Sequence, residues 1–178
     1  SRDFLSMRYL LFIIALVVIT PGRVVAAPTA DAFGTLPTVY DAAISPDGKQ
    51  IAIIMNIQGD YGVRVVSRGE TGEKLRAVLL EKGVKPNWIK WANDERVLVG
   101  LWESRKMRAT PYTVSFIHTL DVSSMKGKTL IEAEEGKLRQ NNSHVVDFLE
   151  DDPDHILMAF SDANQFQVDI NRVNVKTG

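Results

Sequence analysis

Few side chains of this 178-residue chain have the type and spacing that covalent chemistry requires. A serine nucleophile exposed on a strand–elbow–helix turn has the pattern G-x-S-x-G, which the sequence lacks. The chain contains no cysteine, which excludes disulfides, thiolate metal ligands and a cysteine nucleophile. It has neither a Walker phosphate loop nor a dinucleotide fingerprint. The candidate serines stand in expected turns or strands and are Ser45, Ser115, Ser123, Ser124, Ser143 and Ser161.

The possible metal ligands do not have the spacing of a metal site. His118, His144 and His155 are scattered, without an H-E-x-x-H motif or paired spacing, so we interpret them as exposed or hydrogen-bonded strand residues rather than zinc ligands. The acidic residues 150–154 lack the D-x-D-x-D-G pattern and distal glutamate of a calcium loop, and they predict an acidic turn. The sequence therefore predicts no metal and no cofactor.

Three further groups could bind a ligand, and each also has a simpler interpretation. Glu134 and Glu135 could hold a substrate amine, but a solvated acidic pair in a loop is favoured. The basic residues 105–108 could form a phosphate or partner site, but a solvated hairpin loop is favoured. Trp88 and Trp91 could stack on a ligand, but core packing is favoured. We assign no catalytic, cofactor-binding or metal-binding residue from the sequence.

The elements that would position these residues are organised around residues 43–54. This stretch reads as the end of one strand, a Ser-Pro-Asp-Gly-Lys turn and a second strand. Pro46 presets its φ angle, Asp47 can bond to its own backbone, and Gly48 accepts the positive φ that closes a short hairpin. Both flanks are apolar, so the two strands can be buried on at least one face.

The same plan recurs in weaker form at residues 89–99 and 146–158, where an Asn/Asp-rich turn precedes a strand. The anchors Ile51, Val97 and Ile156 lie about 46 and then about 59 residues apart, near the length of a propeller blade. A second marker, a strand that runs into a Gly/Lys turn, recurs in phase. Its three copies are strand 63–66 with turn 69–73, strand 116–122 with turn 126–128, and strand 170–175 with turn 176–178.

The two markers predict an all-β fold: a partial β-propeller of about three four-stranded WD40/TolB-like blades. Residues 56–62 are expected to form a polar turn, and the pattern of residues 75–80 fits either a strand or a helical turn. Strands are expected at residues 39–44, 50–55, 63–67, 112–120 and 168–175.

Residues 1–26 are expected to lie outside this fold. The first six look like upstream read-through, and Met7-Arg8 then begins a secretory signal peptide with an apolar core at residues 9–19. Cleavage after Ala26 fits best, cleavage after Ala27 would place a proline just beyond the cut, and an uncleaved anchor is the alternative. The protein is therefore expected to be exported, periplasmic or secreted, with a membrane contact only through its signal peptide.

Residues 27–178 leave about 150 residues, enough for three blades, whereas a closed ring needs roughly four to eight. We therefore expect the N-terminal part of a longer protein. The net charge of −1 gives no indication of nucleic-acid binding.

The order of a signal peptide, the lead-in Asp-Ala-Phe-Gly-Thr-Leu-Pro at residues 31–37 and the Ser-Pro-Asp-Gly-Lys turn resembles bacterial prolyl oligopeptidase-family (S9) serine peptidases. TolB-type and other WD40-like propellers share the turn motif, and the lead-in favours the peptidases. The resemblance covers residues 31–178, although residues 93–95 and 152–154 replace Pro-Asp-Gly in the later repeats.

The resemblance implies an N-terminal propeller that precedes an α/β-hydrolase domain, caps its active site and admits peptides but not folded proteins. The Ser, Asp and His triad lies in that hydrolase domain, so no residue of this chain inherits a catalytic role. The implied partners are the hydrolase domain of the same parent chain and its peptide substrates. In some dipeptidyl members propeller glutamates hold the substrate amino terminus, but Glu134 and Glu135 match no such motif and do not receive that role.

Two alternatives stay open. A TolB-like periplasmic propeller would bind a protein partner and catalyse nothing. A free-standing small β-domain would fold as a cooperative monomer.

Overall fold

The computed structural model describes residue 34 and residues 37–69, 76–132, 141–160 and 168–178. The predicted signal peptide (residues 1–26), most of the lead-in, Glu134, Glu135 and Ser161 lie outside these residues. The chain divides into two compact units, and the description below concerns the second, Leu36–Gly178. No helix within the described residues is long and apolar enough to cross a membrane.

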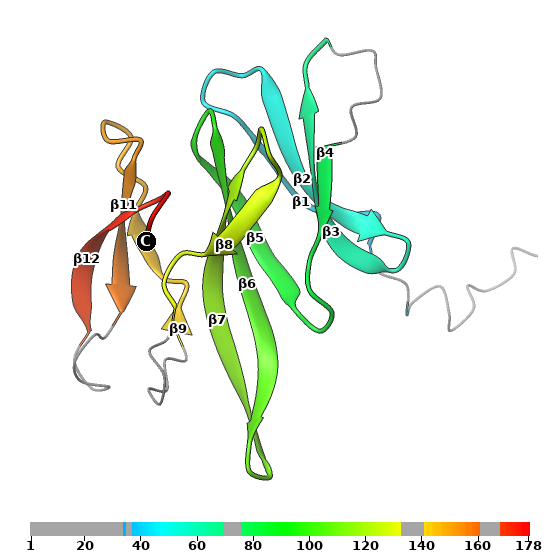
Figure 1. Ribbon diagram of the computed structural model, residues 1–178, viewed down its shortest axis with the longest axis vertical. Helices are drawn as coiled ribbons and strands as arrows, with labels where there is room; N and C mark the ends of the chain where they lie inside the picture. The colour runs from blue at the N-terminus through cyan, green and yellow to red at the C-terminus, as the bar shows by residue number, and fades with distance from the viewer. Residues whose placement is uncertain (1–33, 35–36, 70–75, 133–140, 161–167) are drawn as a thin grey trace, which may run out of the picture. The chain divides into compact units, whose positions relative to one another are not determined.

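The described chain is all-β and forms three sheets whose neighbouring strands are antiparallel, with one short parallel exception (Figure 1). The first sheet has the order β1-β2-β3-β4, the middle sheet β5-β6-β7-β8, and the third sheet β10-β11-β12. The short strand β9 (Asn141–Asn142) pairs in parallel with β7 of the middle sheet. Each sheet is therefore built from strands that follow one another along the chain, as successive hairpins require.

Strand bounds confirm the repeat that the anchors predicted. The first sheet contains β1 (Val39–Ile44), β2 (Gln50–Ile57), β3 (Asp60–Ser67) and β4 (Arg76–Leu79). The middle sheet contains β5 (Lys85–Asn93), β6 (Arg96–Met107), β7 (Thr110–Asp121) and β8 (Lys126–Thr129). The third sheet contains β10 (Val145–Asp147), β11 (His155–Phe160) and β12 (Asp169–Asn174). The anchors Ile51, Val97 and Ile156 each occupy the second position of their strand.

The middle sheet buries side chains on both of its faces. Because successive residues of a strand point to opposite faces, Val97 and Val99 of β6 face one way and Leu98 faces the other. Val97 and Val99 share a buried cluster with Ala52 and Ile54 of the first sheet. Leu98 belongs to a second cluster, whose members from the third sheet are Ile156, Met158, Phe160, Val173 and Val175. The first and third sheets thus pack on opposite faces of the middle sheet (Figure 1).

The two tryptophans that could have stacked on a ligand pack instead against these clusters. Trp91 is buried and belongs to the cluster between the first and middle sheets. Trp88 packs on the other cluster and meets Phe148 edge-on, with ring centroids 6.2 Å apart. The preference for core packing is therefore confirmed for both residues.

Three details differ from the sequence prediction, and one alternative that it left open is decided. Strands β2 and β3 extend through the expected polar turn, leaving only Gln58 and Gly59, both with positive φ, to close the hairpin. Residues 126–128 form β8 rather than a turn, because the chain already turns at residues 122–125. Residues 76–79 of the undecided segment form a strand. The third sheet has three described strands rather than four.

Gly100 provides a test of how Trp88 packs across the β5–β6 pair of the middle sheet, on the face toward the third sheet. A Cβ atom added there would lie 2.3 Å from the ring of Trp88, so an alanine must displace the indole. Glycine in a strand normally costs roughly 0.5–1 kcal/mol relative to alanine, and relief of that cost opposes the clash. Overpacking typically costs about 1–3 kcal/mol, so we expect Gly100→Ala to lower the free energy of unfolding in urea.

The clash with Trp88, rather than the loss of the glycine backbone, should cause the lower free energy of unfolding of Gly100→Ala. In a Trp88→Leu background the space is open, and Gly100→Ala should then cost less than half as much. Equal costs in the two backgrounds would contradict this packing.

Candidate functional site

The Ser45–Lys49 motif forms a closed turn rather than an exposed reactive site. Ser45 is buried, and its hydroxyl donates to Asp47 Oδ1 at 2.7 Å while accepting from the backbone N of Gln50 at 2.9 Å. The Gly48 amide donates to the Ser45 carbonyl at 2.9 Å, and Gly48 has the positive φ (71°) expected of this turn. Ser45 is therefore fully engaged in the turn and is not placed as a nucleophile.

The carboxylate of Asp47 is stabilised in its charged form. Hydrogen bonds from the Ser45 hydroxyl and from the Lys49 backbone and side chain lower the pKa of Asp47 to about 2. The Lys49 ammonium lies 3.0 Å from Asp47 Oδ2. An acceptor held this way organises the turn but cannot serve as a general acid or base near neutral pH.

Each turn also bonds to the turn of the next sheet. The backbone N of Asp47 donates to Asp94 Oδ1 at 2.9 Å, and Gln50 Nε2 donates to the Asp94 carbonyl at 3.1 Å. One repeat later, Asn93 Nδ2 donates to the Pro153 carbonyl at 2.8 Å. The three turns therefore form a continuous hydrogen-bonded row across the three sheets.

Two further hydrogen bonds join neighbouring sheets. Trp91 Nε1 donates to the Ala43 carbonyl at 2.9 Å, which ties the middle sheet to the first strand. Thr119 is buried, and its hydroxyl donates to the Val175 carbonyl of the third sheet at 2.6 Å. Because such buried polar groups are costly unless they are bonded, these contacts favour one spacing of the sheets over others.

A second repeated turn follows the third strand of the middle and third sheets. Asp121 Oδ1 accepts hydrogen bonds from the backbone and hydroxyl groups of Ser123 and Ser124, at 2.7–3.1 Å. In the third sheet Asn174 Oδ1 plays the same part, accepting from the backbone of Lys176 and Thr177. The Ser123 hydroxyl is the largest cause that lowers the pKa of Asp121 to about 2, and Arg96 adds to it. The two turns are structural equivalents.

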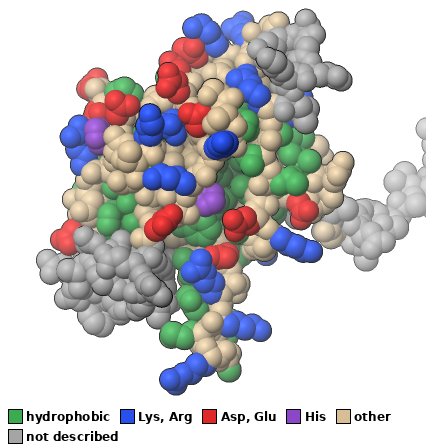
Figure 2. All heavy atoms as spheres, in the orientation of Figure 1, with side chains coloured by type: hydrophobic (Ala, Val, Ile, Leu, Met, Phe, Trp, Pro, Cys, Tyr) green, Lys and Arg blue, Asp and Glu red, His purple; other side chains and the backbone are tan. Residues whose placement is uncertain are grey.

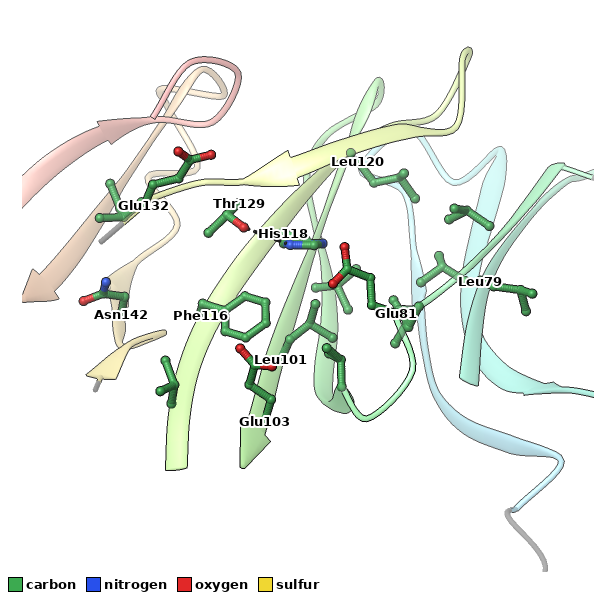
Figure 3. Close-up of a pocket in the computed structure, with 18 of the residues that line it drawn as sticks. Leu79, Glu81, Leu101, Glu103, Phe116, His118, Leu120, Thr129, Glu132 and Asn142 are labelled. Carbon is green, nitrogen blue, oxygen red and sulfur yellow. Dashed lines mark hydrogen bonds between the residues drawn. The ribbon is translucent and has the colours of Figure 1, made fainter. Parts of the chain in front are cut away.

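The described residues also enclose a groove between the first and middle sheets, with a volume of about 440 Å³ (Figure 3). Its floor is apolar and includes Leu101, Phe116 and Leu120, while Leu79 and Leu80 line the opposite wall. Strand β4 and the residues after it supply that wall, and β6 and β7 supply the floor. A volume of this size is at the lower end of small-ligand pockets.

His118 is the titratable group at the centre of the groove. Its Nε2 lies 3.0 Å from the Thr129 hydroxyl, and its ring packs beside Phe116 with centroids 5.3 Å apart. Burial lowers the pKa of His118, and the nearby charge of Glu81 opposes this shift. Figure 3 shows the Glu81 side chain reaching toward the imidazole. The imidazole is therefore biased toward its neutral form, in which one ring nitrogen donates a hydrogen bond and the other accepts one.

The groove contains acid–base groups but no covalent nucleophile arrangement among the described residues. Glu103 and Arg105 at its rim form an ion pair of 2.5 Å, so each neutralises the other. Among the residues that the structure describes, no serine lines the groove. The arrangement can hold a small, largely apolar group beside a neutral imidazole.

The basic run is placed differently from the prediction. Arg105, Lys106 and Met107 are the last residues of β6 and pair with the start of β7, so only Arg108 and Ala109 form the turn. Beyond Trp102, where the pairing with β5 ends, the two strands continue as a ribbon (Figure 1). Figure 2 shows basic side chains at the tip of this ribbon.

The other histidines and the acidic turn do not meet at a metal site. His155 Nδ1 lies 3.0 Å from Asp152 Oδ1, and Arg172 bonds to the other oxygen of Asp152. The His155 hydrogen bond is the largest cause that lowers the pKa of Asp152, followed by that from Arg172. His144 is exposed before β10. No cluster suited to a metal ion occurs in the part of the chain that the structure describes.

The sequence reasoning missed the groove. The alternation of Phe116, His118 and Leu120 on β7 could have shown that His118 shares a face with apolar residues. The opposite wall depends on how two sheets pack, which no local pattern reveals.

Comparison with protein-family models found no match to this sequence. Comparison with curated proteins likewise found no significant match.

The two turn carboxylates predict a pH dependence of stability. Asp47 and Asp121 have folded-state pKa values of about 2, whereas unfolded aspartates titrate near 3.9. A depressed folded-state pKa contributes stability that is present above the unfolded value and is lost as the pH falls toward the folded one. We therefore expect the free energy of unfolding, measured in urea, to decrease between about pH 5 and pH 2.

Asp121→Asn should lower stability at neutral pH and flatten this decrease. Asp60→Asn is the matched control, because no hydrogen bond of the Asp60 carboxylate occurs among the described residues. An unchanged pH profile for Asp121→Asn would contradict the role assigned to this carboxylate.

Proposed function

We propose that residues 27–178 are consecutive blades of a β-propeller in an exported prolyl oligopeptidase-like serine peptidase. In this proposal the propeller is a non-catalytic module that admits peptides to a hydrolase active site and excludes folded proteins. Peptide hydrolysis would proceed by acyl transfer from a serine outside these residues. The observation that carries the proposal is the row of turns, in which the Ser-Pro-Asp-Gly-Lys turn bonds to the corresponding turn of the next sheet.

The sheet packing supports a propeller arrangement. Propeller blades are antiparallel sheets of about four strands, each packed between two neighbours. The middle sheet has this environment, with Ala52 and Ile54 against one face and Ile156 and Met158 against the other. A two-layer sandwich would instead leave the middle sheet with one buried face.

The chemistry of the described residues supports a non-catalytic role. Ser45, Ser123 and Ser124 are committed to turns, and His118 bonds to a threonine rather than to a serine. The propeller would then select substrates by size alone, excluding folded proteins. Such selection requires a stable ring and no reactive group.

The second candidate is a TolB-like periplasmic propeller that binds a protein partner. The β6–β7 ribbon favours it, because Met107 at its tip is 53% exposed beside Lys106 and Arg108. An exposed apolar side chain flanked by cations is suited to contact with a protein surface that carries acidic groups.

The gene that encodes this chain distinguishes the two candidates. For the peptidase, we expect the reading frame beyond the codon for Gly178 to encode a G-x-S-x-G elbow followed by an aspartate and a histidine. A frame that ends once a ring of four to eight blades is complete would contradict the peptidase and support the binding module.

A chemical test complements the gene sequence. The whole protein should react with a fluorophosphonate serine probe and release a chromophore from a proline-containing peptide substrate, and residues 27–178 alone should do neither. The matched control is the whole protein with its elbow serine changed to alanine. Equal labelling of this variant would show that the probe reacts elsewhere.

A further inference from the structure

The groove between the first and middle sheets contains a buried amide that has no partner. The side chain of Asn142 lines the groove and is only 5% exposed. No hydrogen bond of its carboxamide occurs within the described residues. Burial of an unpaired amide is unfavourable, and most buried polar side chains are bonded. A ligand that enters the groove could supply the missing partner.

The strand register places Asn142 on the groove face of the middle sheet. Asn142 of β9 is aligned with Phe116 of β7, and His118, two residues along β7, is aligned with Thr129 of β8. Aligned residues of neighbouring strands share a face, and so do residues two apart in one strand. The amide therefore points to the same side as the two aromatic rings, and all of these residues line the groove.

A carboxylate lies across the groove from this amide. Glu81 follows β4 on the opposite wall, and its side chain reaches toward the imidazole of His118 (Figure 3). Figure 3 also shows Asn142 and Glu81 on opposite sides of the Phe116 and His118 rings. The groove thus presents a hydrogen-bonding amide at one end, aromatic rings in the middle and a carboxylate at the other end.

The charges of the lining favour a cation. The acidic residues that line the groove are Glu81, Glu103 and Glu132. Arg105 is the basic residue of the described lining, and it is paired with Glu103. Glu81 and Glu132 are therefore left uncompensated, and an anion would meet their charges. The aromatic ring of Phe116 adds to the preference, because such rings attract cations to their faces.

We propose that the groove binds an elongated organic amine, with its ammonium group at Glu81, its apolar or aromatic body over Phe116, and a polar group at its far end bonded to the carboxamide of Asn142. The volume of about 440 Å³ is sufficient for a small amine with one aromatic ring. The inference does not rest on the proposed function, because the groove is formed by the described residues whatever the rest of the protein does.

NMR titration of the isotope-labelled protein with tyramine tests this site. Tyramine carries an ammonium group on one side of its aromatic ring and a hydroxyl on the other. We expect saturable shifts with a Kd of about 1 mM, as for a fragment of this size. The carboxamide signal of Asn142, identified by its absence from Asn142→Leu, should be among those that move. Phloretate, in which a carboxylate replaces the ammonium, should cause no saturable shift.

Each end of the ligand is tested by its own variant. Glu81→Gln removes the charge and should weaken both tyramine and phenethylamine, which lacks the hydroxyl, by about 3- to 5-fold. Asn142→Leu removes the amide and should weaken tyramine by about 3- to 10-fold without weakening phenethylamine. Glu95→Gln is the matched control, because Glu95 is exposed in a turn and does not line the groove.

Circular dichroism establishes that each variant is folded. If Asn142→Leu is not, the wild-type protein tests the same contact through the two amines. Tyramine should then bind about 3- to 10-fold more tightly than phenethylamine, because only tyramine can bond to the amide.

Three results would overturn the proposal. Phloretate that binds as tightly as tyramine would exclude selection of a cation. An equal effect of Asn142→Leu on both amines would exclude the contact between the amide and the hydroxyl. No saturable shift with tyramine would exclude an amine, and concentration-dependent shifts of the protein alone would then assign the groove to a side chain of a second copy. None of these results bears on the serine-probe experiment, so the two proposals fail separately.

Discussion

The middle sheet has two apolar faces, and this constraint organises the rest of the described structure. A sheet with one apolar face can be stabilised by a single layer packed against it. The alternation of Val97, Leu98 and Val99 on β6 forbids that solution, because water would then contact a row of branched side chains. The chain satisfies the constraint by placing a hairpin-built sheet on either side. The hydrophobic effect is non-directional, so it decides that the sheets stack but not how far they are shifted along each other.

Hydrogen bonds between the turns determine how far neighbouring sheets are shifted along each other. Asp47, Asp94 and Asn93 belong to turns whose sequences differ, yet each bonds to the neighbouring turn. Asn93 Oδ1 accepts the Glu95 amide at 3.0 Å, as Asp47 Oδ1 accepts the Lys49 amide at the same distance. The later repeats can therefore lose the Pro-Asp-Gly signature while keeping its geometry. What the turn requires is an acceptor oxygen and a free amide in the right place.

The sequence predicted what local chemistry controls, and it missed what depends on distant contacts. The spacing of Ile51, Val97 and Ile156 located the three hairpins, because each follows a turn with its own side-chain bonds. The preference for core packing at Trp88 and Trp91 was correct, because large aromatic side chains in repeated sheets more often fill the space between sheets than bind a ligand. The expectation of a turn at residues 126–128 was wrong. The hydroxyls of Ser123 and Ser124 donate hydrogen bonds to Asp121, so the chain turns before residue 126. The groove around His118 could not be found, because its walls come from two sheets.

The positions of the indoles have a consequence for how separation of the sheets could be observed. Trp91 bonds across the seam between the first and middle sheets, and Trp88 packs into the seam between the middle and third sheets. Each seam thus holds a natural fluorophore of its own. If one seam opened before the other, the emission of the indole in that seam would shift to longer wavelength. The emission of the other indole would not change. Each of the two interfaces between sheets therefore contains a tryptophan whose fluorescence reports on that interface.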